Sequence, residues 1–117
     1  HERRPILFFV VTSPENHARI DEIRANHLAS LQPGAAASDG PAIIWLNYGV
    51  HGAESAGMDA SLPTLYHLAA AEGAEIEQTL DDSVILITAI FNPDGHSRRI
   101  NHVETFGGDV PVTDPRP

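Results

Sequence analysis

Hydrophobic residues in this chain gather in three short continuous runs, at residues 6–12, 42–48 and 84–91. Each run is rich in β-branched or aromatic residues, and polar positions do not alternate with them. Short runs of this kind are typical of strands that are buried on both faces. The pattern therefore predicts three strands inside a folded core.

Between these runs, apolar residues recur at helical spacing. Three stretches show it, at residues 14–32, 55–71 and 75–80. Ser13, Pro14 and Glu15 predict the first helix start, because serine caps, proline suits the first turn and an acid favours the helix dipole. Pro63 lies inside the second stretch and should kink that helix, because it removes a backbone donor.

The last apolar run ends in Asn92, Pro93, Asp94 and Gly95, which together predict a tight turn. Beyond Gly95 the periodicity fades among glycines, prolines and scattered charges. We therefore predict no helix or strand after this turn.

The order strand, helix, strand, helix, strand predicts an α/β fold. It implies a three-layer sandwich, with helices on both faces of a mostly parallel, mixed central sheet. Three strands are few for such a fold, which usually has five or six. We expect residues 1–117 to form a partial domain, truncated at both ends; the alternative is a complete small domain with an irregular tail.

Charge and composition exclude several classes of function. The net charge is −9, from 16 acidic and 7 basic residues, and phosphates would be repelled by such a surface. We therefore expect no nucleic-acid partner. No apolar run approaches the roughly 20 residues of a membrane span. Cysteine is absent, so a metal would need His, Asp or Glu ligands. The compartment and the oligomeric state are not indicated.

His51 and Glu54 are the first candidates for such ligands. His51 follows the second predicted strand and Glu54 opens the helix after it, in the stretch Asn-Tyr-Gly-Val-His-Gly-Ala-Glu-Ser-Ala-Gly. In an open α/β sheet, ligands bind outside the carboxyl ends of the strands. Imidazole nitrogen and carboxylate oxygen are both normal zinc donors. A purely structural role remains the alternative. Glu54 would then only favour the helix dipole, and His51 would be a polar loop residue.

Two motifs together resemble the zinc carboxypeptidase family. His-Gly-Ala-Glu-Ser, at residues 51–55, follows an apolar strand, and Phe-Asn-Pro-Asp-Gly, at residues 91–95, follows the next one. The Arg-Pro-Ile that enters the first strand is also similar, so the resemblance spans residues 4–101. It is the combination of motifs that is specific, since either alone is weak.

The resemblance implies a segment of a phosphorylase/hydrolase-like carboxypeptidase domain that hydrolyses peptides with zinc. His51 and Glu54 would be the first two zinc ligands. Arg98 would polarise the scissile carbonyl and stabilise the oxyanion, with Arg99 as the less favoured match, and both would contact the substrate. Asn92 and Asp94 would shape their loop. Members of the family are often exported, which would suit a secreted or periplasmic protein.

Parts of the family's site are not visible in this sequence. The family uses a third ligand, a histidine on a later strand, an Asn-Arg pair for the substrate carboxylate, and a late glutamate as general base. His96 and His102 follow Glu54, but they lie just after the predicted turn and not on a later strand. The alternative for both residues is that they are solvated loop histidines without a ligand role. His17, His27 and His67 fall on predicted helices.

Two other functions compete with a carboxypeptidase. The related acylase branch, which resembles aspartoacylase and succinylglutamate desuccinylase, also uses a His-Gly-x-Glu turn and removes acyl groups from amino acids. The Asn-Pro-Asp-Gly segment favours the peptidase over this branch. The remaining alternative is a non-catalytic α/β module, if the chain is complete as given.

Overall fold

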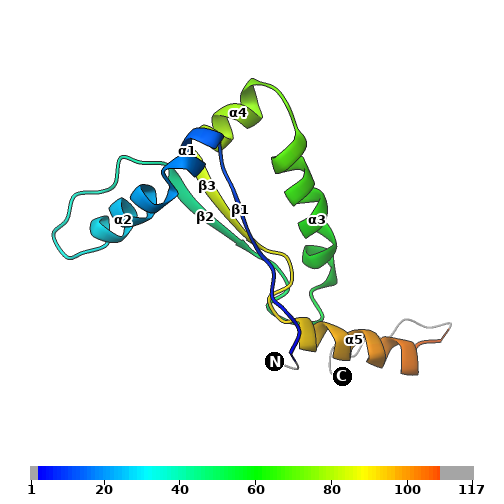
Figure 1. Cartoon of the computed structure of the whole chain (residues 1–117). Helices are drawn as coiled ribbons and strands as arrows, with labels where there is room; N and C mark the ends of the chain where they lie inside the picture. Colours follow the sequence, from blue (N-terminus) through cyan, green and yellow to red (C-terminus); the bar gives the residue numbers. More distant parts are fainter. Residues whose placement is uncertain (1–2, 109–117) are drawn as a thin grey trace.

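A computed structural model describes residues 3–108 of the chain as a three-stranded sheet with helices around it (Figure 1). The strands are β1 (Phe8–Val11), β2 (Ala42–Asn47) and β3 (Ser83–Thr88), in the order β1-β3-β2. The described helices are α1 (Pro14–Ala18), α2 (Ile20–Ser30), α3 (Ser55–Ala70), α4 (Ala74–Asp81) and α5 (Pro93–Phe106). The α/β class is confirmed.

The sheet is mixed in equal parts. Strand β2 pairs with β3 in parallel, with Asn47 opposite Thr88, whereas β1 pairs with β3 antiparallel, with Phe8 opposite Thr88. The expectation of a mostly parallel sheet therefore needs correction, since one of its two pairings is antiparallel. The antiparallel pairing has a consequence for the site, because the segment that precedes β1 lies at the edge where β2 and β3 end.

The three predicted strands and the three predicted helical stretches are present, with small shifts at their ends. Ser13 caps α1, and its Oγ accepts a hydrogen bond from the backbone N–H of Asn16 at 3.4 Å. The first stretch is nevertheless two helices, because the backbone leaves helical geometry at Arg19 (φ −122°, ψ 28°). Helix α3 runs through Pro63 from Ser55 to Ala70.

The prediction of no element after Gly95 was wrong. Helix α5 begins at Pro93, and Asn92 caps it by accepting a hydrogen bond from the N–H of Gly95 at 2.9 Å. The four residues predicted as a tight turn are therefore a helix cap and a first helical turn. Residues 109–117, which were also predicted to be irregular, lie outside the described part.

Burial is concentrated on the central strand. Five apolar residues form the core, at Ile23, Met58, Val84, Ile85 and Ile87. Three of them belong to β3, which is buried on both faces as predicted. Strands β1 and β2 are not: Phe8 and Trp45 are both more than half exposed. For these two strands the described structure contradicts the expectation of two buried faces.

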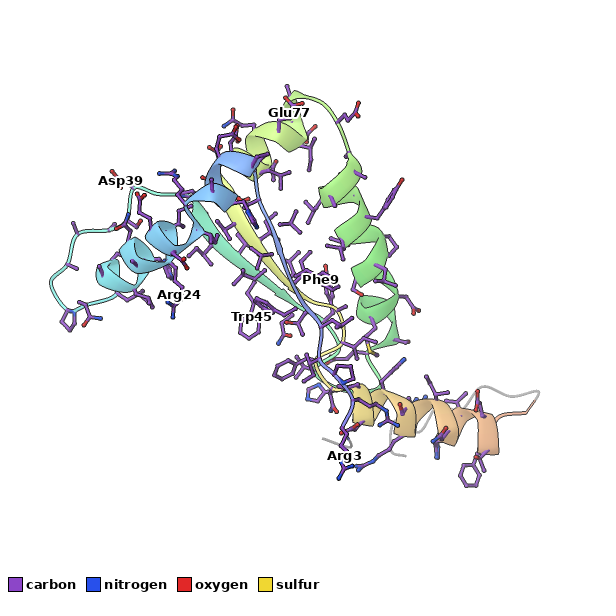
Figure 2. All side chains as sticks on the ribbon, viewed as in Figure 1. Arg3, Phe9, Arg24, Asp39, Trp45 and Glu77 are labelled. Atoms are coloured by element: carbon purple, nitrogen blue, oxygen red, sulfur yellow. The ribbon has the colours of Figure 1, made fainter. Side chains whose placement is uncertain are left out.

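Helices cover the two faces of the sheet only in part. Helix α3 lies along one face, where Leu65 and Leu68 share a groove with Phe9 and Val11. On the other face, Ile23 of α2 shares a groove with Phe8 and Ile43, and Figure 2 shows Trp45 projecting on the side away from α3. The radius of gyration is 18.4 Å, against about 13 Å for a compact domain of this length. None of the described helices is both long enough and apolar enough to span a membrane.

Truncating Ile87 should destabilise the protein more than truncating any exposed apolar residue. Ile87 is fully buried on the central strand β3, so Ile87→Ala leaves a cavity and should lower the free energy of unfolding by about 2–5 kcal/mol. Leu31→Ala is the control, because Leu31 is exposed after α2. Urea unfolding of the full-length protein measures both, and equal losses would contradict the position of the core.

Candidate functional site

The candidate site is built on two backbone segments that leave the carboxyl ends of β2 and β3 side by side. Their pairing continues past the strands: the N–H of Tyr48 donates to the carbonyl of Thr88 at 3.0 Å, and the N–H of Phe91 donates to the carbonyl of Tyr48 at 2.9 Å. The N–H of Asn92 then donates to the carbonyl of Gly49 at 3.0 Å. The start of α5 is thereby fixed against the turn that carries His51.

His51 and Glu54 meet at the tip of this turn. His51 Nδ1 lies 2.8 Å from Glu54 Oε1, and the backbone N–H of His51 donates to Glu54 Oε2 at 3.0 Å. The turn is closed by the N–H of Glu54, which donates to the carbonyl of His51 at 3.1 Å. Both side chains are open to solvent, with 78% and 50% of their surfaces exposed. An imidazole nitrogen and a carboxylate oxygen therefore converge on one accessible point.

The hydrogen bonds from His51 also change the charge state of Glu54. They lower the pKa of the Glu54 carboxyl below its usual value, first through the backbone N–H of His51 and then through its side chain. Desolvation acts in the opposite direction and is outweighed. The carboxylate is thus ionised at neutral pH, which is the form that binds a metal.

Two glycines allow this turn to form. Gly49 has φ +65°, and a Cβ there would meet the side chain of Met58 at 2.7 Å. At Gly52 a Cβ would lie 2.0 Å from the carbonyl carbon of Gly95 and 2.5 Å from the backbone nitrogen of His96. The turn and the first turn of α5 are therefore in direct backbone contact, at a distance that excludes any side chain at position 52.

Asn92 links the same two segments through its side chain. Its Oδ1 accepts from Gly95 and caps α5, while its Nδ2 donates to the carbonyl of Val50 at 3.3 Å. Both ends of the amide are used, and Val50 is the residue that precedes His51. Asn92 therefore shapes the loop, as the resemblance implied, by bridging the helix start to the turn.

The arginines lie on the second turn of α5. Arg98 is exposed and Arg99 is partly buried. Arg99 and His96 line a groove of about 390 Å³ between α5 and the turn, together with Gly52 and Ser55. The helix thus places Arg99 next to the turn, whereas Arg98 lies on a different side of α5.

The histidines considered as a third ligand do not complete a metal site. His96 lies against the turn, where its Nδ1 is 3.4 Å from the carbonyl of Gly52. His102 packs its ring on Phe106, with 5.0 Å between the ring centroids. Within residues 3–108, no three His, Asp or Glu side chains are grouped so that they could hold a metal ion. The donors present fit zinc chemically, but they supply two ligands where a catalytic zinc site has three.

Sequence reasoning missed three features of this site. They are helix α5 itself, the contact of Gly52 with Gly95, and an ion pair between Arg4 and Asp94. The sequence did contain a signal for the start of this helix. Asn92 is a capping residue, Pro93 suits the first helical position, and Asp94 is an acid in the first turn. The two contacts join segments far apart in the chain and have no local signal.

Acid should weaken the link between Glu54 and His51. Because the pKa of Glu54 is lowered on folding, the stabilisation is present above the unfolded value and is lost as the pH falls through the folded one. NMR titration of the Glu54 carboxyl carbon in the metal-free protein should show this lowered pKa. In His51→Ala the shift should shrink but persist, because the backbone donor remains; an unshifted wild-type pKa would contradict the geometry.

Adding one methyl group at Gly52 should separate the turn from α5. Gly52→Ala forces a Cβ into the backbone of Gly95 and should lower the free energy of unfolding by about 3 kcal/mol or more. Gly57→Ala is the matched control: its Cβ meets only Tyr48, at 3.4 Å, and alanine is the better helix former. Urea unfolding of the full-length protein compares the two, and equal stabilities would show that the segments are not in contact.

Comparison with known proteins identifies a family for this chain. The sequence profile of the zinc carboxypeptidase family matches residues 1–105, which include the turn at His51, the segment at Asn92 and nearly all of α5. No curated protein and no solved structure matches the chain. A profile match over nine-tenths of the chain is sufficient to establish the family, and the chain belongs to the zinc carboxypeptidase family.

Proposed function

We propose that this chain is part of a zinc-dependent carboxypeptidase, which hydrolyses the C-terminal peptide bond of peptides. The observation that carries the proposal is the meeting of His51 and Glu54 at the carboxyl end of two parallel strands, 2.8 Å apart and open to solvent. In the proposed site His51 Nδ1 and the Glu54 carboxylate are two zinc ligands. Family membership supports zinc as the metal.

Bound zinc would supply Lewis-acid activation of a water molecule and of the scissile carbonyl. The chain's own residues prepare the donors: the N–H of His51 orients the carboxylate of Glu54 and keeps it ionised. A third ligand and a general base are still required, and we propose that residues outside the described part provide them. Two ligands from one turn alone should hold the metal weakly.

Arg98 is proposed to stabilise the negative charge that develops on the carbonyl oxygen. It is exposed on α5, one turn after the segment that contacts the His51 turn. A guanidinium placed in advance at the position of a developing oxyanion acts most strongly in the transition state. Arg99, which lines the groove beside Gly52 and Ser55, is proposed to contact the substrate.

The domain that contains this site is proposed to be larger than the described structure, with helices on both faces of a longer sheet. Phe8 and Trp45 leave apolar surface open on the two edge strands. Asn47 Oδ1, at the end of β2, is buried and has no hydrogen-bond partner among the described residues. An unpaired buried acceptor costs about 1–3 kcal/mol, so a further segment that donates to it would stabilise the fold.

Removing His51 should abolish zinc binding. The full-length protein should bind one zinc ion, and His51→Ala should lose it, because Glu54 alone cannot replace the lost donor. His67→Ala is the control, since His67 is exposed on α3. Mass spectrometry measures the zinc content of the three proteins, and undiminished zinc in His51→Ala would refute the ligand assignment.

Substrate assays on the same proteins separate the remaining alternatives. Release of C-terminal residues from peptides, lost in His51→Ala, is the expected result. Release of acyl groups from N-acyl amino acids would instead favour the acylase branch. No hydrolysis of either substrate by the zinc-loaded protein would favour a non-catalytic module.

A further inference from the structure

An ion pair joins the segment before β1 to the first turn of α5. Arg4 Nη1 donates to Asp94 Oδ1 at 2.6 Å, across 90 positions of sequence. The Asp94 side chain is mostly buried, with 12% of its surface exposed, whereas that of Arg4 is 40% exposed. A short charge-assisted hydrogen bond to a buried carboxylate is stronger and more directional than one on an open surface.

The antiparallel pairing of β1 explains how two such distant residues meet. Because Phe8 lies opposite Thr88, the chain before β1 passes beyond the edge at which β2 and β3 end. Arg3, the neighbour of Arg4, lies near the start of α5 in Figure 2. The segment at Arg4 therefore contacts α5 on the side of the sheet edge that carries the site.

Little of helix α5 is buried. Of its described residues only Asp94 is buried, and its apolar residues Ile100, Val103 and Phe106 are exposed. Its start is held against the turn at His51, where Asn92 bridges to Val50 and Gly95 lies against Gly52. The pair with Arg4 adds an attachment from a third segment of the chain.

Asp94 and Arg98 are four residues apart on α5 and so lie on one face, one turn from each other. A helix transmits a change of direction at its first turn to the next turn, because its backbone is a continuous hydrogen-bonded ladder. The place of the Arg98 guanidinium therefore depends on how the first turn is held.

We propose that Arg4 and Asp94 are positioning residues, whose ion pair sets the direction of α5 and so places Arg98 over the reacting carbonyl. This inference rests on the role proposed above for Arg98. Neither residue touches the substrate or the metal. Removing Arg4 deprives a mostly buried carboxylate of one cationic partner, and the first turn then shifts towards solvent.

The test uses Arg4→Met and Asp94→Asn in the full-length, zinc-loaded protein. Each should lower kcat on a peptide substrate by about tenfold to a hundredfold, because a misplacement of about 1 Å is enough for such a loss. The KM and the zinc content should change little, since His51 and Glu54 are untouched. The double variant should lose no more than either single one, because both remove the same interaction.

Arg24→Met is the matched control. Arg24 is exposed on α2, away from Arg3 and α5 in Figure 2, and its loss should leave kcat unchanged. A normal kcat in Arg4→Met, or losses that multiply in the double variant, would overturn the proposal while leaving the proposed function intact.

Hydrogen exchange separates failure of this inference from failure of the proposed function. If the wild-type protein hydrolyses no peptide, the proposed function is refuted. The role of the ion pair in holding α5 is then measured by hydrogen exchange in the metal-free protein. Amides 95–99 of α5 should then exchange at least about tenfold faster in Arg4→Met than in Arg24→Met, because the helix opens more readily. Equal exchange in the two variants would overturn the proposal.

Discussion

The site depends on one run of backbone hydrogen bonds, the parallel pairing of β2 with β3 and its continuation past the strand ends. Three bonds follow Asn47 and Thr88 outwards and reach Asn92, so the register of the strands also sets the register of the loops. A slip of one residue would turn every strand side chain to the other face and would also move His51 away from α5. The fully buried Ile87, on the central strand β3, makes such a slip costly.

Helix prediction succeeded at Ser13 and failed at Asn92, although the two starts have the same form. Each has a capping residue, then proline, then an acid. The two helices differ in the residues beyond their first turns. The stretch that begins at Ser13 continues from α1 into α2, where Ile20, Ile23 and Leu28 supply apolar positions at helical spacing. In α5, residues 93–99 contain no large apolar side chain, so Ile100, Val103 and Phe106 come too late to mark a helix that begins at Pro93.

The sequence correctly predicted three strands, but it wrongly predicted that β1 and β2 are buried on both faces. A continuous apolar run shows that a strand suits a covered sheet, but it does not say which residues cover it. Strand β3 is covered within the described chain, whereas Phe8 on β1 and Trp45 on β2 are not. The site shows the same limit: the spacing of His51 and Glu54 could be read locally, whereas the pair of Arg4 with Asp94 depends on the antiparallel pairing of β1.

The turn holds its two donors in a form that suits metal binding. The contact between His51 Nδ1 and Glu54 Oε1 must give way when both atoms bind a metal, but the bond from the His51 N–H to Oε2 need not. That backbone bond is also the first cause of the lowered pKa of Glu54. The carboxylate would thus stay ionised and oriented if the His51 side chain turned to a metal. Such outer contacts tune metal affinity in many sites, and here the main chain of a proposed ligand residue would provide one.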